Sequence, residues 1–467
     1  MAKGTAGGRA GWVVAGLIVL VVLVATNVWN PFPDMWEWVS RTRPLSSPDT
    51  AWQQSVGGQP KSVTITGSVA VVEQGTSVEG RSLGTGVRLW KREVNWGAVA
   101  GEGDNAVVVV GELLKKGYEV IDPRSGIVWR KDTQAVAVWT YRDALLDVRC
   151  SDAKDCTLSA WEPRGTKPRW TAELPGVGFV LFADNPDLLD AKPLTARGIA
   201  GDVAGPVVLP SLLGFPIDNK VRVVDTSDGR VARDFEPERE DRYAVVGGRL
   251  VRVEARSGDG TCYFTVTATD AATDRQVWQK EALNLRTASG AGCTQRDDPN
   301  GGQNVVVGVG ANGREVVVDA YDGRILWLGK KGEKLQAVDD SYAIVRPEDG
   351  KSVVSYAYGA SRPRWTKPVH DSKAQTAITP YAVVTVQEDP HRITAWAPSS
   401  GKELVTIKSE AKVWAVGPAG MIIGEGRHIG YVPFAGVTST PNGTRAPNGT
   451  GAEGCDGPKE PQCRAEK

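Results

Sequence analysis

Four short stretches of the sequence have residue types and spacings that could do chemistry. The first, "GVGANG", places Gly308, Gly310 and Gly313 in the G-x-G-x-x-G spacing that binds a dinucleotide. Such a site needs a helix directly after the glycines, because the helix N-terminus holds the pyrophosphate. Here "REVVVDA" follows, which is a strand pattern. We therefore predict a hairpin turn at these glycines.

The other three stretches could supply a nucleophile or metal ligands. "SDAK" and "SEAK" match an S-x-x-K pattern of serine acyl-transfer enzymes, but that pattern requires a helix and partner motifs, so we predict solvated turns. "DDPNGGQN" offers Asp297, Asp298 and Asn300 as oxygen ligands for Ca²⁺, yet it lacks the closing Glu and the spacing of a known calcium loop. We assign no catalytic, cofactor-binding or metal-binding residue and expect no cofactor.

The cysteines are better suited to disulfides than to a metal. Their even number fits an oxidising compartment, although sequence alone leaves the connectivity open. Proximity favours Cys150 with Cys156, across "CSDAKDC", and Cys455 with Cys463, which would leave Cys262 and Cys293 to each other. Zinc is the alternative, but the sequence has no C-x-x-C pair and its histidines are scattered, at His370, His391 and His428.

A repeated turn shows which elements position these residues. "VIDPRSGIVW" predicts two short strands around a turn, in which Pro123 presets φ, Gly126 takes positive φ, and Trp129 lies on the return strand. The steps between copies are 38 to 49 residues, with one step of 62. The other copies end at Trp90, Trp170, Trp278, Trp327 and Trp365, and two weaker copies fall near Ala232 and Leu404.

This period, with several strand-like runs per unit and almost no helical pattern, is typical of a β-propeller. We predict an all-β, eight-bladed β-propeller at residues 62–435, with seven or nine blades left open. A β-sandwich is the alternative, but it gives no reason for the tryptophan to recur. The six tryptophans are predicted to fill the wedges between blades. Aspartates of the turns are predicted to accept hydrogen bonds from their own backbone, at Asp122, Asp225, Asp270 and Asp319.

The strand-like runs at the two ends of the repeat array do not add up to whole blades. Trp52 lies one further period ahead of Trp90, and three strand-like runs, "KVWAVG", "GMIIGE" and "HIGYVP", follow the copy near Leu404. Either the early segment pairs with these last runs and closes the ring, or one copy is not a full blade.

The order of an apolar strand, an Asp or small residue, a glycine turn and a tryptophan resembles the docking repeat of the PQQ-like propellers. That family includes the quinoprotein dehydrogenases and the non-catalytic BamB-type scaffolds, and the resemblance covers residues 62–433. Its dehydrogenases carry a disulfide between adjacent cysteines, together with acidic and Asn ligands for Ca²⁺. This sequence has no Cys-Cys pair, and the ligand set cannot be placed on it. The resemblance therefore implies a non-catalytic scaffold that binds a protein or envelope component. The alternative is an extracytoplasmic enzyme that uses the propeller funnel, either a divergent quinoprotein dehydrogenase or a hydrolase.

The N-terminus predicts a membrane anchor. Lys3 and Arg9 precede an uncharged stretch from Gly11 to Trp29, which as a helix would cross a bilayer. We predict a cytoplasmic segment at 1–10, an uncleaved transmembrane signal anchor at 11–30 and a juxtamembrane linker at 31–61, with the propeller outside the cell membrane. A cleaved signal peptide is the alternative, for which Leu23 before Ala25 is a poor cleavage pattern. The tail, 436–467, is too poor in apolar residues to fold and is expected to be disordered apart from a loop closed by its cysteines.

Charge and the long repeat step bear on partners. The chain has 55 Lys and Arg against 55 Asp and Glu, which gives no reason to expect a nucleic-acid partner. The surplus of the long step falls at residues 183–218, predicted to leave the ring as a loop. Its apolar, proline-broken run is the predicted partner-binding surface, and the alternative is that the run packs back over the end of its own propeller. That run contains Leu209, Pro210, Leu212, Leu213 and Phe215.

Overall fold

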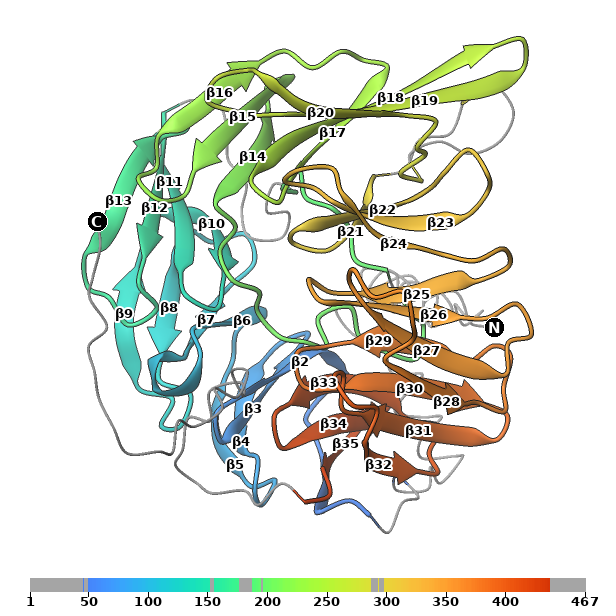
Figure 1. Ribbon diagram of the computed structural model, residues 1–467. Helices are drawn as coiled ribbons and strands as arrows, with labels where there is room; N and C mark the ends of the chain where they lie inside the picture. The colour runs from blue at the N-terminus through green and yellow to red at the C-terminus, as the bar shows by residue number, and fades with distance from the viewer. Residues whose placement is uncertain are drawn as a thin grey trace, which may run out of the picture. The chain divides into compact units, whose positions relative to one another are not determined.

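Nine antiparallel sheets make up the described part of the chain (Figure 1). The computed structural model describes residues 45, 49–151, 155–175, 187–194, 196–286, 293 and 298–436. These residues belong to Met1–Val437, the larger of two units into which the chain divides. Eight of the described sheets have four strands and one has three. We call the sheets blades I to IX.

The blades follow one another along the chain, and each begins with the strand that we call its first strand. Blade I contains β2 (Pro60–Thr66), β3 (Val69–Gln74), β4 (Val78–Ser82) and β5 (Arg88–Arg92), and blade II contains β6 (Trp96–Ala100), β7 (Val107–Gly111), β8 (Tyr118–Ile121) and β9 (Val128–Asp132). Blade III contains β10 (Ala135–Thr140), β11 (Leu145–Cys150), β12 (Cys156–Trp161) and β13 (Pro168–Glu173). Blade IV contains β14 (Leu212–Ile217), β15 (Lys220–Asp225) and β16 (Val231–Phe235). A short 3-10 helix, η1 (Gly103–Asn105), lies in blade II.

Blades V to IX continue the same order. Blade V contains β17 (Asp241–Val246), β18 (Arg249–Gly258), β19 (Thr261–Thr269) and β20 (Gln276–Glu281), and blade VI contains β21 (Asn300–Gly301), β22 (Val305–Val309), β23 (Glu315–Asp319) and β24 (Ile325–Leu328). Blade VII contains β25 (Lys334–Val338), β26 (Tyr342–Arg346), β27 (Ser352–Ala357) and β28 (Trp365–Pro368), and blade VIII contains β29 (Gln375–Ile378), β30 (Val383–Glu388), β31 (His391–Trp396) and β32 (Glu403–Ile407). Blade IX contains β33 (Lys412–Gly417), β34 (Gly420–Glu425), β35 (His428–Pro433) and β1 (Trp52–Ser55).

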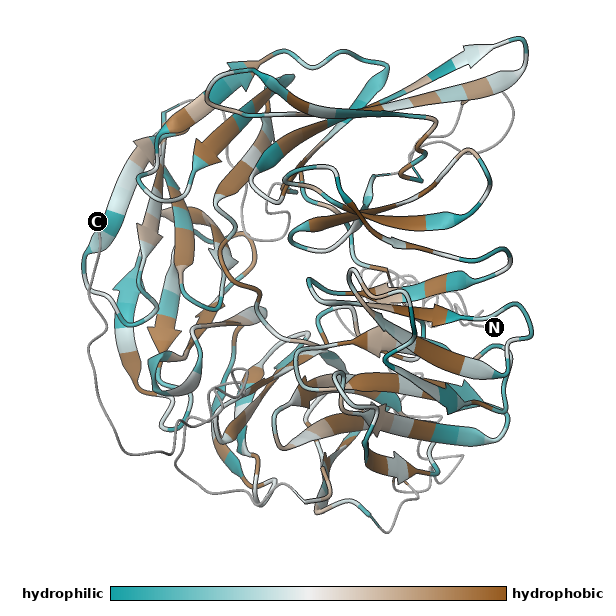
Figure 2. Cartoon of the chain, viewed as in Figure 1, coloured by the Kyte–Doolittle hydropathy of each residue, from teal (hydrophilic) through white to brown (hydrophobic). Residues whose placement is uncertain are grey.

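Burial explains why the middle strands are continuous apolar runs. All five residues of β7, "VVVVG", are buried, because neighbouring blades cover both faces of the sheet. The last strand of the same blade, β9, has no buried residue, since it forms the free edge of its sheet. Figure 2 shows the same trend, with apolar residues gathered in the middle strands and polar residues in the loops.

Hydrophobic clusters join each blade to the next around a complete ring. Val71 of blade I packs in one cluster with Val108 of blade II, and the series continues through every consecutive pair of blades. The last cluster returns to the start, because it contains Trp414 of blade IX and Val63 of blade I. The described residues therefore form an all-β, nine-bladed propeller.

Blade IX corrects the expected count of eight blades to nine. Both ends of the described chain build it, because Trp52 of β1 pairs with Tyr431 of β35. The early segment thus closes the ring, which is one of the two possibilities that the sequence leaves open. Counting repeats misses this blade because its tryptophan strand and its other three strands lie at opposite ends of the sequence.

Several predicted segments lie outside the described residues. These are the cytoplasmic segment and the anchor at 1–30, most of the linker that follows, the tail from residue 437 with Cys455 and Cys463, and Asp297. Within the described ranges, no helix is long and apolar enough to cross a membrane.

Candidate functional site

Tryptophans of the outer strands dock onto a turn of the next blade. Trp90 of β5 donates its indole N–H to the carbonyl oxygen of Pro123 at 2.7 Å, and only 9% of its surface is exposed. Its ring lies against Gly126, where φ is +67° and an added Cβ would lie 2.6 Å from the ring. The same indole-to-carbonyl bond joins Trp52 to Leu83, Trp170 to Thr226, Trp278 to Ala320 and Trp365 to Pro398.

Two of the predicted docking tryptophans are placed differently. Trp327 is buried and packs against Tyr356 of the next blade, with ring centroids 6.1 Å apart. Trp129 donates its indole N–H to the carbonyl oxygen of Arg164 at 2.9 Å, but 50% of its surface is exposed. The space beside Gly165 in that turn is taken by Glu162, so the indole of Trp129 is not seated on a glycine.

The two weak copies of the repeat lack an indole for a physical reason. The turn next to Ala232 carries Asp274 at the place that Gly126 holds in its own turn, and Arg233 pairs with Asp274. A Cβ at that place would enter the space that an indole needs. Leu404 lies beside blade IX, where β35 and β1 are paired strands but are not joined by a turn. An indole at residue 404 would therefore have no turn to dock onto.

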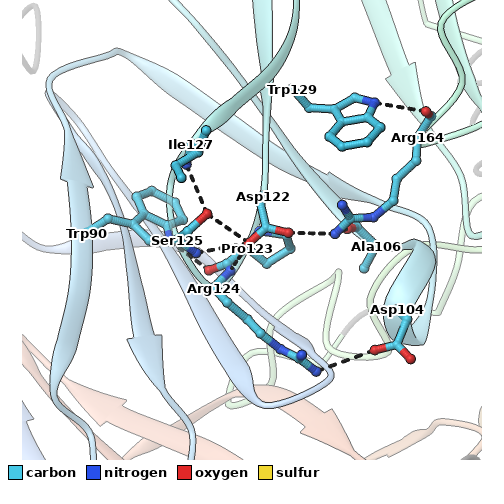
Figure 3. A network of polar contacts seen from close by, with 10 residues as sticks. All are labelled: Trp90, Asp104, Ala106, Asp122, Pro123, Arg124, Ser125, Ile127, Trp129 and Arg164. Carbon is cyan, nitrogen blue, oxygen red and sulfur yellow. Dashed lines mark hydrogen bonds and ion pairs between the residues drawn. The ribbon is translucent and has the colours of Figure 1, made fainter.

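Asp122 holds the turn of blade II together (Figure 3). Its Oδ1 accepts hydrogen bonds from the backbone N–H groups of Arg124 and Ser125, both at 3.0 Å. Its Oδ2 accepts from Nη2 of Arg164, in the next blade, at 2.7 Å. Partial burial opposes ionisation of this carboxyl, but the hydrogen bonds outweigh it and lower its pKa to about 2. The corresponding aspartates also accept from their own turns, at Asp225, Asp270 and Asp319.

Beside this network, the outer edge of blade II exposes apolar residues. Ile127 is 68% exposed and is followed by Val128 and the half-exposed Trp129. The guanidinium of Arg164 lies 5.6 Å from the Trp129 ring, and Figure 3 shows that it reaches from there to Asp122. We call Ile127, Val128, Trp129 and Arg164 the outer corner.

A segment of the chain itself lies along the inside of the ring. We call residues 187–211 the crossing segment; residue 195 lies outside the described residues. Leu189 donates its N–H to Gly214 of blade IV at 2.9 Å and accepts from Val245 of blade V. Lys192 bridges to Asn300 of blade VI, and Ile199 bridges to Val413 of blade IX. In Figure 1 the segment runs in green along the inner strands.

The crossing segment then returns to the side of the ring from which it started. The carbonyl oxygen of Val207 accepts from the N–H of Arg142 in blade III at 2.7 Å, and the N–H of Leu209 donates to Asp143 at 2.8 Å. The expectation that residues 183–218 leave the ring as a loop on one face is therefore wrong for residues 187–211. The edges of the first strands offer hydrogen-bond partners to the backbone of this segment. The backbone of an outward loop would have to form these hydrogen bonds with water instead.

Two of the hollows on the described part of the propeller lie between neighbouring blades or beside the crossing segment. One, of about 340 Å³, separates the outer strands of blades III and IV and is lined by Glu173 and Arg230 among others. The other, of about 410 Å³, has walls from the crossing segment and from blades VII and VIII. Arg197, Gln336 and Lys373 are among its lining residues. We call the second one the inner hollow.

The predicted partner-binding run lies mostly within blade IV. Leu212, Leu213 and Phe215 belong to β14. Phe215 is fully buried and meets the ring of Trp139 edge-on at 5.7 Å, so neither it nor the buried Leu213 offers a surface to a partner. Leu209 packs against the same core, and Pro210 accepts a hydrogen bond from Thr226 at its carbonyl oxygen. Pro216 is accommodated in β14 because this strand pairs with another strand on one side only.

The described cysteines form two disulfides, as their spacing predicts. Cys150 bonds to Cys156, and these residues face each other on β11 and β12. Cys262 bonds to Cys293 and so ties down the hairpin of β18 and β19, which extends beyond the other strands of its blade. Gly310 and Gly313 of "GVGANG" lie in the predicted hairpin turn between β22 and β23, whereas Gly308 lies within β22. Ser409 of "SEAK", expected in a solvated turn, is buried.

A buried network of titratable groups lies between blades II and III. Asp147 has no exposed surface, and burial raises its pKa, although Tyr118 donates its hydroxyl to Asp147 at 2.7 Å and Arg149 lies nearby. Asp147 lines neither of the two hollows. We therefore assign this network to blade packing.

The described residues do not fit PQQ with Ca²⁺, the cofactor of the dehydrogenases in the resembled family. In the described ranges, no group of three or more His, Cys, Asp or Glu side chains is arranged to hold a metal ion. The two disulfides there join cysteines that are 6 and 31 residues apart in sequence, so neither is a disulfide of adjacent cysteines. Bound PQQ with its Ca²⁺ has no matching donor set in this part of the chain.

The docking repeat and the closed ring define the chain as a β-propeller. Among solved structures it is similar to BamB from Moraxella catarrhalis, with 14% identity over 77% of this chain and 99% of that one and a TM-score of 0.34. It is also similar to quinohemoprotein alcohol dehydrogenase from Comamonas testosteroni, with 10% identity over 86% and 78% and a TM-score of 0.37. Sqt1 from Saccharomyces cerevisiae matches with 10% identity over 83% and 99% and a TM-score of 0.36.

The similar structures thus include BamB and a quinohemoprotein dehydrogenase. At these identities and TM-scores they carry no inference about function. No family model matches the chain, and no curated protein matches it. The function has to be argued from the site itself.

Proposed function

We propose that the chain is a non-catalytic propeller, anchored in the cell membrane and facing outward, that holds a protein or an envelope component. The observation that carries this proposal is the crossing segment. The first strands of blades IV, V, VI and IX are bonded to the chain's own residues 187–211, so a large partner cannot pair with these strands from inside the ring. Binding of a large partner is therefore assigned to the outside of the ring.

The outer corner is the contact that we assign to the partner. Trp129 and Arg164 are of the residue types that dominate the energy of protein interfaces. Trp129 belongs to β9, and Arg164 lies against its ring. Because β9 is the last strand of its sheet, it has backbone groups that can pair with another strand. Ile127 adds an exposed apolar side chain to this edge. Lys3, Arg9 and the apolar stretch after them support the membrane anchor, and protease added to intact cells should remove the propeller while leaving an embedded N-terminal fragment.

Cross-linking of the full chain in intact cells tests the proposed function. We expect one or more proteins or envelope polymers to co-purify with the wild-type chain. The double variant Ile127→Ser, Trp129→Ala should lose them with little change in melting temperature, because both side chains are exposed. Ile325→Ser is a matched control, since Ile325 is an exposed residue of the outer strand β24.

Two outcomes would contradict the proposal. The first is dye reduction by the purified chain after reconstitution with PQQ and Ca²⁺, which would make it an enzyme. The second is unchanged co-purification by the double variant together with loss in the Ile325→Ser control, which would move the partner to another edge of the ring.

A further inference from the structure

The inner hollow is lined mainly by polar side chains from three parts of the chain. Arg197 comes from the crossing segment, Gln336 from β25 of blade VII, and Lys373 and Gln375 from the start of blade VIII. Its volume of about 410 Å³ is within the usual range for sites that bind small molecules. The crossing segment therefore completes this hollow, although it bonds to the inner strands elsewhere.

The position of Arg197 is fixed by its neighbours in sequence. The N–H of Gly198 donates to Oε1 of Gln375 at 2.7 Å, and the N–H of Val413 donates to the carbonyl oxygen of Gly198 at 3.0 Å. These bonds hold the backbone next to Arg197 against blades VIII and IX. The wall of the hollow that contains Arg197 is therefore held in place by backbone hydrogen bonds to the blades.

Two cations face this hollow without a counter-ion. In the described residues, neither Arg197 nor Lys373 forms an ion pair or a side-chain hydrogen bond, and both side chains are exposed. A third cation lies just behind the wall. The buried Arg346 donates through Nη1 to the carbonyl oxygens of Asp371 and Ser372, at 3.0 and 2.7 Å, and these residues directly precede Lys373.

Two carboxylates reduce this positive charge but do not cancel it. Asp371 accepts from the backbone N–H of Lys373 at 2.7 Å and from that of Glu388 at 2.8 Å. Glu388 itself lines the hollow. Among the residues that line the hollow, Arg197 and Lys373 are cations and Glu388 is the carboxylate, so the lining carries one net positive charge.

We propose that the inner hollow binds a small polar ligand through one phosphate or carboxylate group. The guanidinium of Arg197 can bind such a group with two hydrogen bonds, and Lys373 adds a compact charge. Glu388 limits the ligand, because a second anionic group would be repelled. This proposal goes beyond the scaffold function, which uses the outside of the ring.

Calorimetry on the full chain in detergent at low ionic strength tests the inner hollow, with inorganic phosphate and acetate as separate probes. We expect saturable binding of at least one probe at millimolar concentration. Arg197→Gln and Lys373→Gln should each weaken it about tenfold, as loss of a charge-assisted hydrogen bond does. Both side chains are exposed, so the variants should melt like the wild type. Lys402→Gln, at an exposed lysine in the outer turn of blade VIII, is the matched control and should bind normally.

The outcomes separate the two sources of the anion and decide the proposal. Binding of phosphate alone assigns a phosphorylated ligand, and binding of acetate alone assigns a carboxylate. Absence of saturable binding of both probes would overturn the site. Equal binding by the wild type and by both hollow variants would do so as well, since the anion would then lie elsewhere.

Discussion

Glycine and tryptophan act as a pair at the corners of this propeller. In blade I, the turn between β4 and β5 contains two glycines with different roles. At Gly86, φ is +72° and an added Cβ would lie 2.6 Å from the ring of Trp52. At Gly84, an added Cβ would meet nothing within 4 Å. One turn therefore supplies both the test and its control.

Gly86→Ala should lower the free energy of unfolding by about 2 kcal/mol, because the substitution combines a left-handed backbone with overpacking against an indole. Gly84→Ala should change it by less than about 0.5 kcal/mol. Urea denaturation of both variants measures the difference. Equal effects of the two substitutions would show that Trp52 does not dock on Gly86 in solution.

Asp122 should make stability depend on pH in the acid range. Its folded pKa is lowered to about 2, below the ordinary value for aspartate of about 3.9. Its contribution to stability is therefore fully present above pH 4 or so and is lost as the pH falls from about 4 towards 2. Asp122→Asn should make the fall in melting temperature over this range smaller. Asp104→Asn removes an exposed carboxylate of the same blade and is the control; an identical pH profile for both variants would contradict the prediction.

At the scale of elements, the sequence predicts what is local and misses what is distant. The turn around Asp122 and the docking of Trp90 depend on residue types that recur at a fixed spacing, so the blades could be recognised. The crossing segment has no such signature, because backbone groups make many of its bonds. Gly198 and Gln375, which it joins, are 177 residues apart in sequence. The inner hollow depends on that contact, and Arg197 and Lys373 could not be predicted from the sequence to share it.

The run at 209–216 shows how composition alone misleads. An apolar, proline-broken segment resembles an exposed contact surface, yet Phe215 belongs to β14 and has no exposed surface. A strand can tolerate Pro216 where it pairs with another strand on one side only. Burial between blades III and IV, which is a property of the tertiary structure, decides the role of this segment.

Phe215→Ala should lower the free energy of unfolding by about 3–5 kcal/mol, as truncation of a buried aromatic residue does. Leu209→Ala should have less than half of this effect, because Leu209 is only partly buried. Chemical denaturation of the two variants checks the order. A larger effect at Leu209 would mean that the segment packs differently in solution.

At the scale of the whole molecule, the ring depends on one strand from the start of the chain. β1 supplies Trp52, which donates to Leu83 of blade I at 2.7 Å and lies on the strand that pairs with β35. Without β1, β35 would become the free edge of a three-stranded blade next to blade I.

Removal of residues 1–56 should lower the free energy of unfolding by at least about 3 kcal/mol, from loss of the buried indole alone. Removal of residues 1–44 retains Leu45 and β1 and is the matched control, for which we expect little change. Both truncated chains can be compared by thermal melting and by limited proteolysis. Equal melting temperatures would show that the ring does not need β1 to close.

Blade IX also imposes an order of events during synthesis. Trp52 and its partner Tyr431 are 379 residues apart in sequence (431 minus 52). A ribosome that adds about 5–20 residues per second needs about 20–80 s to cover that distance. β1 is among the first parts of the propeller to emerge and waits for the last, so eight blades can form while the ninth is one strand without a partner. During that interval the nascent protein exposes a free strand edge, which is the period in which a chaperone or a neighbouring chain can pair with it.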